Sequence, residues 1–548
     1  MAETGQVASK SRLASDPIAV LLIAGFSILA AIMFWHVAEL LAFLKAVLFY
    51  PYSLDYGEGI VWQQMRDMLR GTAYSPLQVY PAIVYHYPPV YHMTSAALAA
   101  FTGMDQLVAG RTVSILSTFA TAYIVGLLSA RALPEEAGGR VRAICATMAG
   151  LFFLTCYPVL VWTPLMRVDM LSGALGLAGI LLALRALDRP AWIYGAVALF
   201  LLSVYAKQIS IAAPMAAFSV LLLVRPRLAV RGVGFSLILG LLALAWLSWA
   251  TDGGFLTHIL AYNINRFMPS SFGEILLPQL FSHIMLIALS VLGAAASWQA
   301  IRRNLADCSS LVLIRKALAR NRAAVAALML LIFLALKTIM LLGILKSGAS
   351  FNYMIEWFSA VAIFAGMALA PLAARAMRQM SADRALSPVL VVLALVAMPL
   401  QLAFLPRYFP DAQVLAQAMT LKSMAGARIV ERIASSSRPV IADDMTLLIR
   451  ARRNVEWESA ITAELGQLGK YDQDAFTKLV RAHCFGLFVI EGETDQPPFK
   501  VRYNPPVAEA ILSAYPKEEK INGFSLRTPS ATPEANKGCP TERHRANS

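Results

Sequence analysis

Long apolar runs constrain this 548-residue chain most strongly, because they recur from Ile18 to Pro406. A helix needs roughly 20 mostly apolar residues to cross the hydrocarbon core of a bilayer, and these runs reach that length. Charged residues make up 15% of the chain, whereas about 25% is usual in soluble proteins. The sequence therefore predicts an α-helical polytopic membrane protein.

The basic residues gather in loops that alternate with loops of low charge. Because Lys and Arg are enriched in cytoplasmic loops, the pattern orients the chain and predicts a cytoplasmic N-terminus, where Lys10 and Arg12 lie. The net charge is +14, and the basic residues that produce it are expected to contact lipid head groups. Membrane lipids are therefore predicted partners, and nucleic acid is not. The basic loops hold Arg225, Arg227 and Arg231; Arg302, Arg303, Arg315, Lys316, Arg320 and Arg322; and Arg375, Arg378 and Arg384.

With the basic loops taken as cytoplasmic, the chain is predicted to contain about 11 transmembrane helices. A long loop at about 49–109 follows the first of them and is expected to lie outside. Within this loop, Val90–Phe101 is too short and polar for a span, and reading it as a further crossing would turn the basic loops outward. The expected spans lie near 18–40, 110–130, 144–163, 170–187, 191–206, 208–224, 234–250, 280–298, 323–345, 354–372 and 387–405.

Four parts are predicted along the chain. Residues 1–16 form a cytoplasmic N-terminal tail, and 17–406 form the transmembrane domain. An odd number of spans puts the remainder outside, where 407–528 has the composition of a small α/β domain and 529–548 that of a disordered tail. The elements expected in the small domain are helices at 413–434 and within 461–483, and strands at 439–442 and 485–490.

The cysteines do not form a disulfide framework. Cys145 and Cys156 lie in an apolar segment and Cys308 in a basic loop, where reduced thiols are expected. Cys484 and Cys539 fall in the predicted outer region and could pair, but the sequence leaves this open.

The long outer loop has structure of its own. Apolar residues recur at helical spacing over Gly57–Leu69, which predicts an amphipathic helix on the membrane surface. The pair Pro88-Pro89 then breaks the chain before a short apolar stretch. Since irregular backbone at membrane depth must be buried in protein or line a wet cavity, the loop is expected to form one wall of a cavity.

Charged residues at the outer ends of the spans are the candidates for a functional site, because charges near lipid are costly to keep. Asp55 and Glu58 stand three residues apart just after the first span. Carboxylates here could hold a divalent cation or act as a general base, and basic side chains could hold phosphate oxygens. Taken singly, each could be a local ion pair or an interfacial lysine, but their convergence favours a site. The others expected on this face are Arg167, Asp169, Lys207 and Lys346.

Four neighbouring residues could line a substrate: His86, Tyr87, Asn352 and Tyr353. His86 and His92 flank the proline pair six residues apart, which is not a metal-binding spacing. Interfacial aromatic residues with hydrogen-bonded histidines are the favoured interpretation, and a substrate-facing His86 remains open.

The ordered set of motifs resembles the bacterial GT-C membrane glycosyltransferases, which include family 39-like aminoarabinose transferase and protein O-mannosyltransferase relatives. The resemblance covers about 50–370 well and the C-terminal region loosely. The motifs that carry it are the acidic loop after the first span, Met68-Leu69-Arg70-Gly71, Tyr87-Pro88-Pro89-Val90-Tyr91, Arg111, Arg167-Val168-Asp169, Tyr205-Ala206-Lys207-Gln208 and Asn352-Tyr353.

This resemblance implies an enzyme that takes a sugar from a polyprenyl-phosphate carrier at the outer face of the bacterial inner membrane. The acceptor would be an envelope glycan, lipid or protein. Asp55 would be the principal catalytic carboxylate, with Glu58 assisting and Asp169 as the second acid. Lys207, with Arg167 and Lys346, would bind the donor phosphate. The three carboxylates could also hold a divalent cation, Mg²⁺ or Mn²⁺.

Two departures from the family pattern bear on these roles. Several relatives have a lysine directly before the proline pair, where this chain has Tyr87, so part of the phosphate clamp must come from elsewhere. The acidic motif also separates Asp55 from Glu58, whereas many relatives have adjacent carboxylates, which puts metal dependence in question.

The alternative function is a transporter or flippase of a lipid-linked glycan or other envelope precursor, because buried charges also line transport paths. Transporters tend to place such charges at the bilayer midplane, often in two related halves. In this chain they are expected at the outer ends of helices, and no internal repeat is evident, which favours an enzyme.

Overall fold

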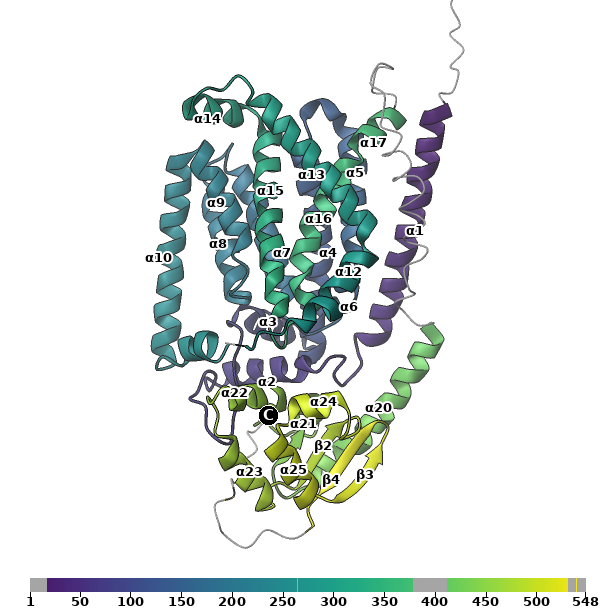
Figure 1. Cartoon of the computed structure of the whole chain (residues 1–548), viewed down its shortest axis with the longest axis vertical. Coiled ribbons are helices and arrows are strands. Elements are labelled where there is room, and N and C mark those ends of the chain that lie inside the picture. Colours follow the sequence, from purple (N-terminus) through teal and green to yellow (C-terminus); the bar gives the residue numbers. More distant parts are fainter. Residues whose placement is uncertain (1–16, 264, 378–411, 531–538, 540–548) are drawn as a thin grey trace, which may run out of the picture.

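Two parts stack along the long axis of the molecule: a bundle of helices and a small domain built on a sheet (Figure 1). Helix α2 (Gly57–Leu69) lies between them, across the bundle axis. The predicted tail 1–16 and nearly all of the predicted tail 529–548 lie outside the described residues. The computed structural model describes residues 17–263, 265–377, 412–530 and 539.

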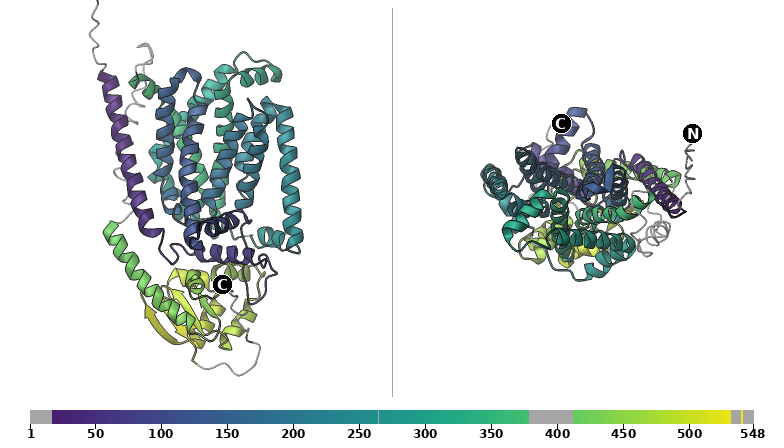
Figure 2. Two further views of the ribbon diagram at one scale, coloured as in Figure 1. Left: turned by 180° about the vertical axis from the view of Figure 1, so that it is seen from behind. Right: turned by 90° about the horizontal axis from the view of Figure 1, so that it is seen from above.

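Seven of the described helices are long and apolar enough to cross a membrane, so this is a multi-pass membrane protein, as predicted. The shorter helices α7 (Asp169–Arg185), α8 (Trp192–Ala206) and α9 (Ala212–Val224) run in the same bundle (Figure 2). The predicted number of about 11 spans is not established, and the predicted span at 387–405 lies outside the described residues. The seven helices are α1 (Pro17–Val47), α4 (Gln106–Ala132), α5 (Gly138–Leu154), α10 (Pro226–Ala250), α13 (Ile284–Asn304), α15 (Arg322–Met340) and α16 (Ile355–Ala368).

Helix α16 forms the centre of the bundle, where it packs against α4, α5 and α13. Small residues permit this close packing: a Cβ at Gly293 of α13 would overlap the Phe364 carbonyl of α16. At Gly366 a Cβ would likewise meet Ala149 and the Cys145 carbonyl of α5. Because lipid provides no hydrophobic drive between helices, such backbone approach and van der Waals packing hold the bundle together.

Proline interrupts two of the predicted spans. The segment predicted as one span at 144–163 divides into α5 and the short α6 (Tyr157–Trp162), because Pro158 cannot continue the hydrogen bonding of α5. Pro371 similarly begins α17 (Ala370–Ala376) directly after α16. The remaining short elements of the bundle are η1 (Glu135–Ala137), α11 (Gly254–Leu256), η2 (Thr257–Ala261), η3 (Phe272–Leu276), α12 (Leu277–Ser282), α14 (Leu311–Arg320), η4 (Leu341–Leu345) and η5 (Phe351–Tyr353).

The outer loop contains two helices that do not cross the bundle. Helix α2 has the predicted bounds, but it lies between the bundle and the small domain instead of on an open membrane surface. Helix α3 (Val90–Thr102) has 13 residues and begins after the proline pair. At 1.5 Å per residue it is about 20 Å long, which is shorter than the roughly 30 Å hydrocarbon core.

The C-terminal domain is a four-stranded mixed sheet covered by helices, with strand order β1-β2-β4-β3. Strands β1 (Val440–Ala442) and β2 (Leu487–Glu491) pair in parallel and match the predicted strands. Strands β3 (Lys517–Ile521) and β4 (Phe524–Thr528) add an antiparallel hairpin. The helices are α20 (Ala412–Ala434), α21 (Met445–Arg450), α22 (Ser459–Gln467), α23 (Gln473–Arg481), α24 (Pro497–Arg502) and α25 (Pro505–Ala514).

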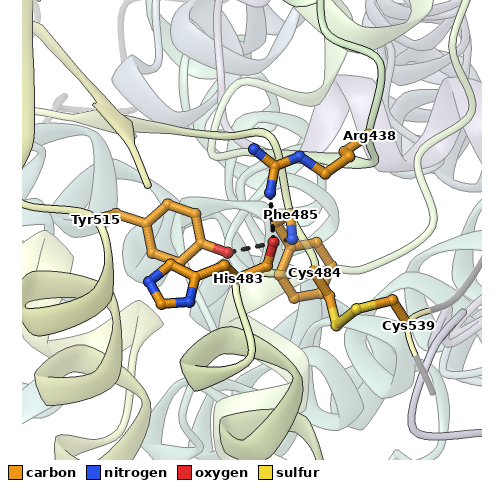
Figure 3. Close-up of a disulfide and its surroundings, with 6 residues drawn as sticks. All are labelled: Arg438, His483, Cys484, Phe485, Tyr515 and Cys539. Carbon is orange, nitrogen blue, oxygen red and sulfur yellow. Dashed lines mark hydrogen bonds between the residues drawn. A yellow bond between two sulfur atoms is a disulfide. The ribbon is translucent and has the colours of Figure 1, made fainter. Parts of the chain in front are cut away.

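Cys484 and Cys539 form a disulfide, which answers the question that the sequence left open. Figure 3 shows the bond beside the start of β2. Arg438 donates a 2.6 Å hydrogen bond to the His483 carbonyl there, and the Phe485 amide donates to the Tyr515 hydroxyl at 3.1 Å. The bridge ties the end of the chain to the sheet across 55 residues of sequence.

The C-terminal domain is docked on the outer loop by polar and backbone contacts. Arg450 forms a 2.7 Å ion pair with Asp105, the residue that caps α4. The Ser53 amide donates to the Thr446 hydroxyl at 3.0 Å, and Ala82 pairs with Trp457 as an isolated bridge. These contacts bring the domain over the same loop in which the candidate carboxylates lie.

Candidate active site

Asp55 and Arg167 form an ion pair just before α2, the helix that lies between the bundle and the C-terminal domain. Asp55 precedes α2, and its Oδ2 accepts a 3.0 Å hydrogen bond from the Gly57 amide. Arg167 comes from the turn between α6 and α7, and any Cβ at Gly57 would overlap its guanidinium group. The Asp55 side chain is 28% exposed, so the pair is accessible to a substrate.

Asp169 and Lys207 form a second ion pair, which is buried. Asp169 begins α7 and Lys207 ends α8, two helices that pack together along the bundle. The Asp169 carboxylate also accepts hydrogen bonds from Trp162 Nε1 at 2.8 Å and from Asn352 Nδ2 at 3.0 Å. Lys207 Nζ lies 5.1 Å from the centre of the Tyr353 ring, a cation–π distance.

Tyr87 lies near both ion pairs. Burial raises the pKa of its hydroxyl, and the negative charge of Asp169 raises it further, while Arg167 and Lys207 oppose this shift. The phenol is therefore within electrostatic range of both pairs, and it stands directly before the pair Pro88-Pro89. A neutral hydroxyl there can donate to a phosphate oxygen, but it cannot supply the positive charge of a lysine.

Glu58 belongs to neither of these pairs, and the acceptor positions of its carboxylate are all occupied by groups of the protein. It is fully buried and forms a two-fold ion pair with Arg111 at 2.8 and 2.9 Å. The amides of Leu54 and Met166 also donate to it, at 2.6 and 2.8 Å. Arg111 in turn donates to four main-chain carbonyls that close the turn between α1 and α2, those of Val47, Leu48, Tyr50 and Tyr52.

Lys346 and His86 belong to a neighbouring region. Lys346 Nζ lies 3.4 Å from the Asn265 side-chain oxygen and is not part of either ion pair. His86 is half-buried, and its desolvation together with the positive charge of Lys346 lowers its pKa to about 4. The His86 carbonyl accepts a 2.8 Å hydrogen bond from Gln208, the residue after Lys207, so this region adjoins the site.

A further buried ion pair was missed by sequence reasoning. Lys337 of α15 pairs with Glu356 of α16 at 2.7 Å, and Glu356 also accepts from Ser210 at 2.9 Å. Lys337 lies within a long apolar run, where the sequence gives no sign of its partner. A charge inside such a run was the available signal, since a buried lysine needs a carboxylate nearby.

The carboxylates predicted as metal ligands do not form a common metal site. Asp55 pairs with Arg167, Glu58 with Arg111 and Asp169 with Lys207, so each faces its own cation. Among the described residues, no group of three or more His, Cys, Asp or Glu side chains could hold a metal ion. The three carboxylates therefore do not act together as one ligand set, and dependence on a divalent cation stays a prediction.

Known proteins with a similar structure were found, but none with a similar sequence. No protein-family model and no curated protein matches this sequence. The structure is similar to ArnT from Cupriavidus metallidurans bound to undecaprenyl phosphate, with a TM-score of 0.55 and 15% identity over 90% of this chain and 97% of that one. The apo state of the same protein gives the same values. The chain has the GT-C membrane glycosyltransferase fold.

The likeness extends over both parts of the molecule, since nearly the whole ArnT chain is covered. The GT-C fold predicted from the motifs is thereby confirmed, together with its small C-terminal domain that contains a sheet. The Archaeoglobus fulgidus oligosaccharyltransferase in the apo form is also similar, with a TM-score of 0.47 and 11% identity over 88% of this chain and 73% of that one.

Proposed function

We propose that this chain is a glycosyltransferase that moves a sugar from a polyprenyl-phosphate donor to an envelope glycan, lipid or protein. The observation that carries this proposal is the presence of two ion pairs, Asp55–Arg167 and Asp169–Lys207, whose charges all act on the Tyr87 hydroxyl. The GT-C fold supports it, as does the undecaprenyl phosphate bound to the similar ArnT. Asp55 is accessible and pairs with one cation, Arg167, and the second pair supplies another cation, Lys207. A base and cations are the groups that this displacement requires.

In the proposed reaction, an acceptor hydroxyl oxygen attacks the anomeric carbon of the donor sugar. The bond between that carbon and the phosphate oxygen breaks, and polyprenyl phosphate leaves with the bonding electrons. Asp55 takes the proton from the acceptor hydroxyl as general base. Lys207 and Arg167 stabilise the charge that develops on the leaving phosphate. Asp169 positions Lys207 through their ion pair, and no step requires a metal ion.

The site is proposed to face the periplasm of a bacterial inner membrane, with the N-terminus in the cytoplasm. The disulfide in the C-terminal domain supports this orientation, because such bonds persist in oxidising compartments. Helix α14, which carries Arg315, Lys316 and Arg320, lies at the opposite end of the bundle (Figure 1). Basic residues there agree with a cytoplasmic end.

The prenyl chain of the donor is proposed to bind in an apolar groove beside the site. The groove is a cavity of about 360 Å³ between α8, α10 and the α11–η2 segment. Gln208 lines it next to Lys207, so a phosphate near Lys207 could continue directly into the groove. The other lining residues are Pro88, Leu201, Val204, Tyr205, Ser236, Leu237, Gly240, Leu241, Leu244, Phe255, Leu256, Ile259 and Leu260.

Filling this groove is expected to weaken binding of long-chain donors selectively. Leu241 lines the groove and is 59% exposed, so Leu241→Trp adds bulk there without disturbing the core. The KM for a long polyprenyl-phosphate sugar should rise about tenfold, while a short-chain donor should be unaffected. The control is Leu242→Trp, an exposed neighbour that does not line the groove. Equal effects of both variants on both donors would remove the groove from the proposal.

Loss of the Lys207 charge is expected to lower turnover strongly. Lys207→Met should reduce the rate of polyprenyl phosphate release at saturating donor about 100-fold, because one preorganised group opposite the leaving phosphate is lost. Lys207→Arg should retain part of the rate. Since the single change also leaves Asp169 unpaired, the double variant Asp169→Asn with Lys207→Met serves as the folding control. Thermal unfolding and product release are measured together.

A folded double variant that releases polyprenyl phosphate at the wild-type rate would show that this ion pair is structural. The proposed role of Lys207 would then be wrong. A folded but inactive double variant is the expected outcome.

A further inference from the structure

Glu458 is a buried carboxyl group of the C-terminal domain that the proposed mechanism does not use. It directly precedes helix α22 and is 7% exposed. Its Oε2 atom is buried and has no hydrogen-bond partner within the described part of the chain. A buried carboxyl oxygen without a partner is costly, which calls for an explanation beyond packing.

The surroundings of Glu458 bring it to the Asp55 side of the candidate site. The next residue, Ser459, forms a 3.0 Å hydrogen bond with the Tyr56 hydroxyl, and the Ala460 amide donates to the same oxygen at 3.2 Å. Tyr56 directly follows Asp55 in the chain. The start of α22 is therefore fixed to the acidic motif of the outer loop.

Arg167 is near enough for its positive charge to lower the pKa of the Glu458 carboxyl. The Nε atom of Arg167 is also buried and has no hydrogen-bond partner among the described residues. The other charged and titratable groups nearby are Asp55, Tyr87 and Asp169 around Arg167, and Asp443 and Arg502 around Tyr56. A donor and an acceptor thus remain unused on the two sides of the boundary between bundle and domain.

The carboxyl group of Glu458 favours its protonated, uncharged form. Burial raises its pKa to about 8, and the charge of Arg167 only partly opposes this. In this form the side chain has both a donor and an acceptor, which suits a hydroxyl group. Hydroxyl groups are abundant in both substrates of a sugar transfer.

We propose that Glu458 is a substrate-binding residue, contributed by the C-terminal domain, that hydrogen-bonds a hydroxyl group of the acceptor beside Asp55. The inference rests on the proposed function. It assigns Glu458 to the acceptor because the start of α22 is hydrogen-bonded to Tyr56, the residue after Asp55, which is the proposed base for the acceptor. The C-terminal domain then completes the site.

The test compares Glu458→Ala and Glu458→Gln with the wild type in membrane discs. The donor is whichever polyprenyl-phosphate sugar the wild type consumes, and the acceptor probe is a glycolipid fraction from cell envelopes at graded concentrations. The alanine variant is expected to need about ten times more of this fraction for half-maximal rate, with an unchanged KM for the donor. The glutamine variant, which keeps a donor and an acceptor, is expected to stay within about threefold of the wild type.

The pH profile separates this role from a structural one. As pH rises through about 8, Glu458 ionises and loses its proton for hydrogen bonding, so wild-type kcat/KM for the acceptor should fall there. Glutamine does not ionise, and this decrease should be absent from the Glu458→Gln profile. A purely structural role would change kcat/KM for donor and acceptor alike, so the decrease must appear for the acceptor and be absent for the donor.

The outcomes distinguish the inference from the proposed function. If the wild type consumes no donor, the proposed function is wrong. If it transfers sugar but both variants match it in their dependence on the glycolipid fraction, the inference is wrong. Equal loss for donor and acceptor in both variants, with lowered thermal stability, also overturns it, because Glu458 would then only hold the domain in place.

Discussion

Replacing Asp55 by asparagine is expected to lower the rate of polyprenyl phosphate release about 1,000-fold, because the site loses its general base. Asparagine has nearly the same shape and keeps an oxygen for the Gly57 amide, but it cannot take a proton from the acceptor. The KM for the donor should change little, since Arg167 and Lys207 remain. The measurement is single-turnover release of polyprenyl phosphate at saturating donor.

The matched control for this variant is Asp67→Asn. Asp67 is another carboxylate of the outer loop, where it accepts hydrogen bonds from Tyr85 at 2.9 Å and Gln63 at 2.8 Å. It belongs to neither ion pair of the site, so its replacement should leave turnover within a few-fold of the wild type. If Asp55→Asn and Asp67→Asn have similar activity, Asp55 is not the base.

Breaking the Glu58–Arg111 pair is expected to destabilise the protein by about 3–5 kcal/mol, because it leaves a fully buried guanidinium without its carboxylate. Glu58→Gln should lower the thermal unfolding midpoint, as should Arg111→Lys, which cannot supply the donors that hold the turn after α1. The fraction that remains folded should retain most of its turnover, since Glu58 has no exposed atom for a substrate.

This result would show that Glu58 stabilises the structure and does not assist catalysis, as the sequence had predicted it would. A Glu58→Gln protein as stable as the wild type but as inactive as Asp55→Asn would restore the original assignment. Thermal unfolding followed by activity per folded molecule decides between the two.

The candidate site was largely predictable because membrane chains keep few charges. Asp55, Arg167, Asp169 and Lys207 were singled out as charges at helix ends, and the structure brings them together in two ion pairs. Their partners were not predictable. The sequence gives no sign that Glu58 meets Arg111, 53 residues away, or that Glu458 approaches from another domain, because such pairing depends on how the helices pack.

Most of the apolar helices were also predictable from the sequence, but some of the breaks and strands were not. Hydropathy located the apolar helices, but it could not detect the break at Pro158, since proline is tolerated in apolar segments when neighbours satisfy the backbone. Strand β3 was missed because its residues are mostly polar and exposed, as suits the edge of a sheet. The signal that could have found it is Asn522-Gly523, which forms the turn to β4 with positive φ at both residues.

The most direct test of the proposed transferase is to offer purified wild-type protein a panel of polyprenyl-phosphate sugars, with the envelope glycolipid fraction as acceptor. Mass spectrometry of the lipids is the measurement. The account expects one donor to be converted to free polyprenyl phosphate, with its sugar gained by an acceptor, and expects neither change with Asp55→Asn. Donors that cross the membrane intact, or no donor consumed, would contradict a transferase, and intact crossing would favour a flippase.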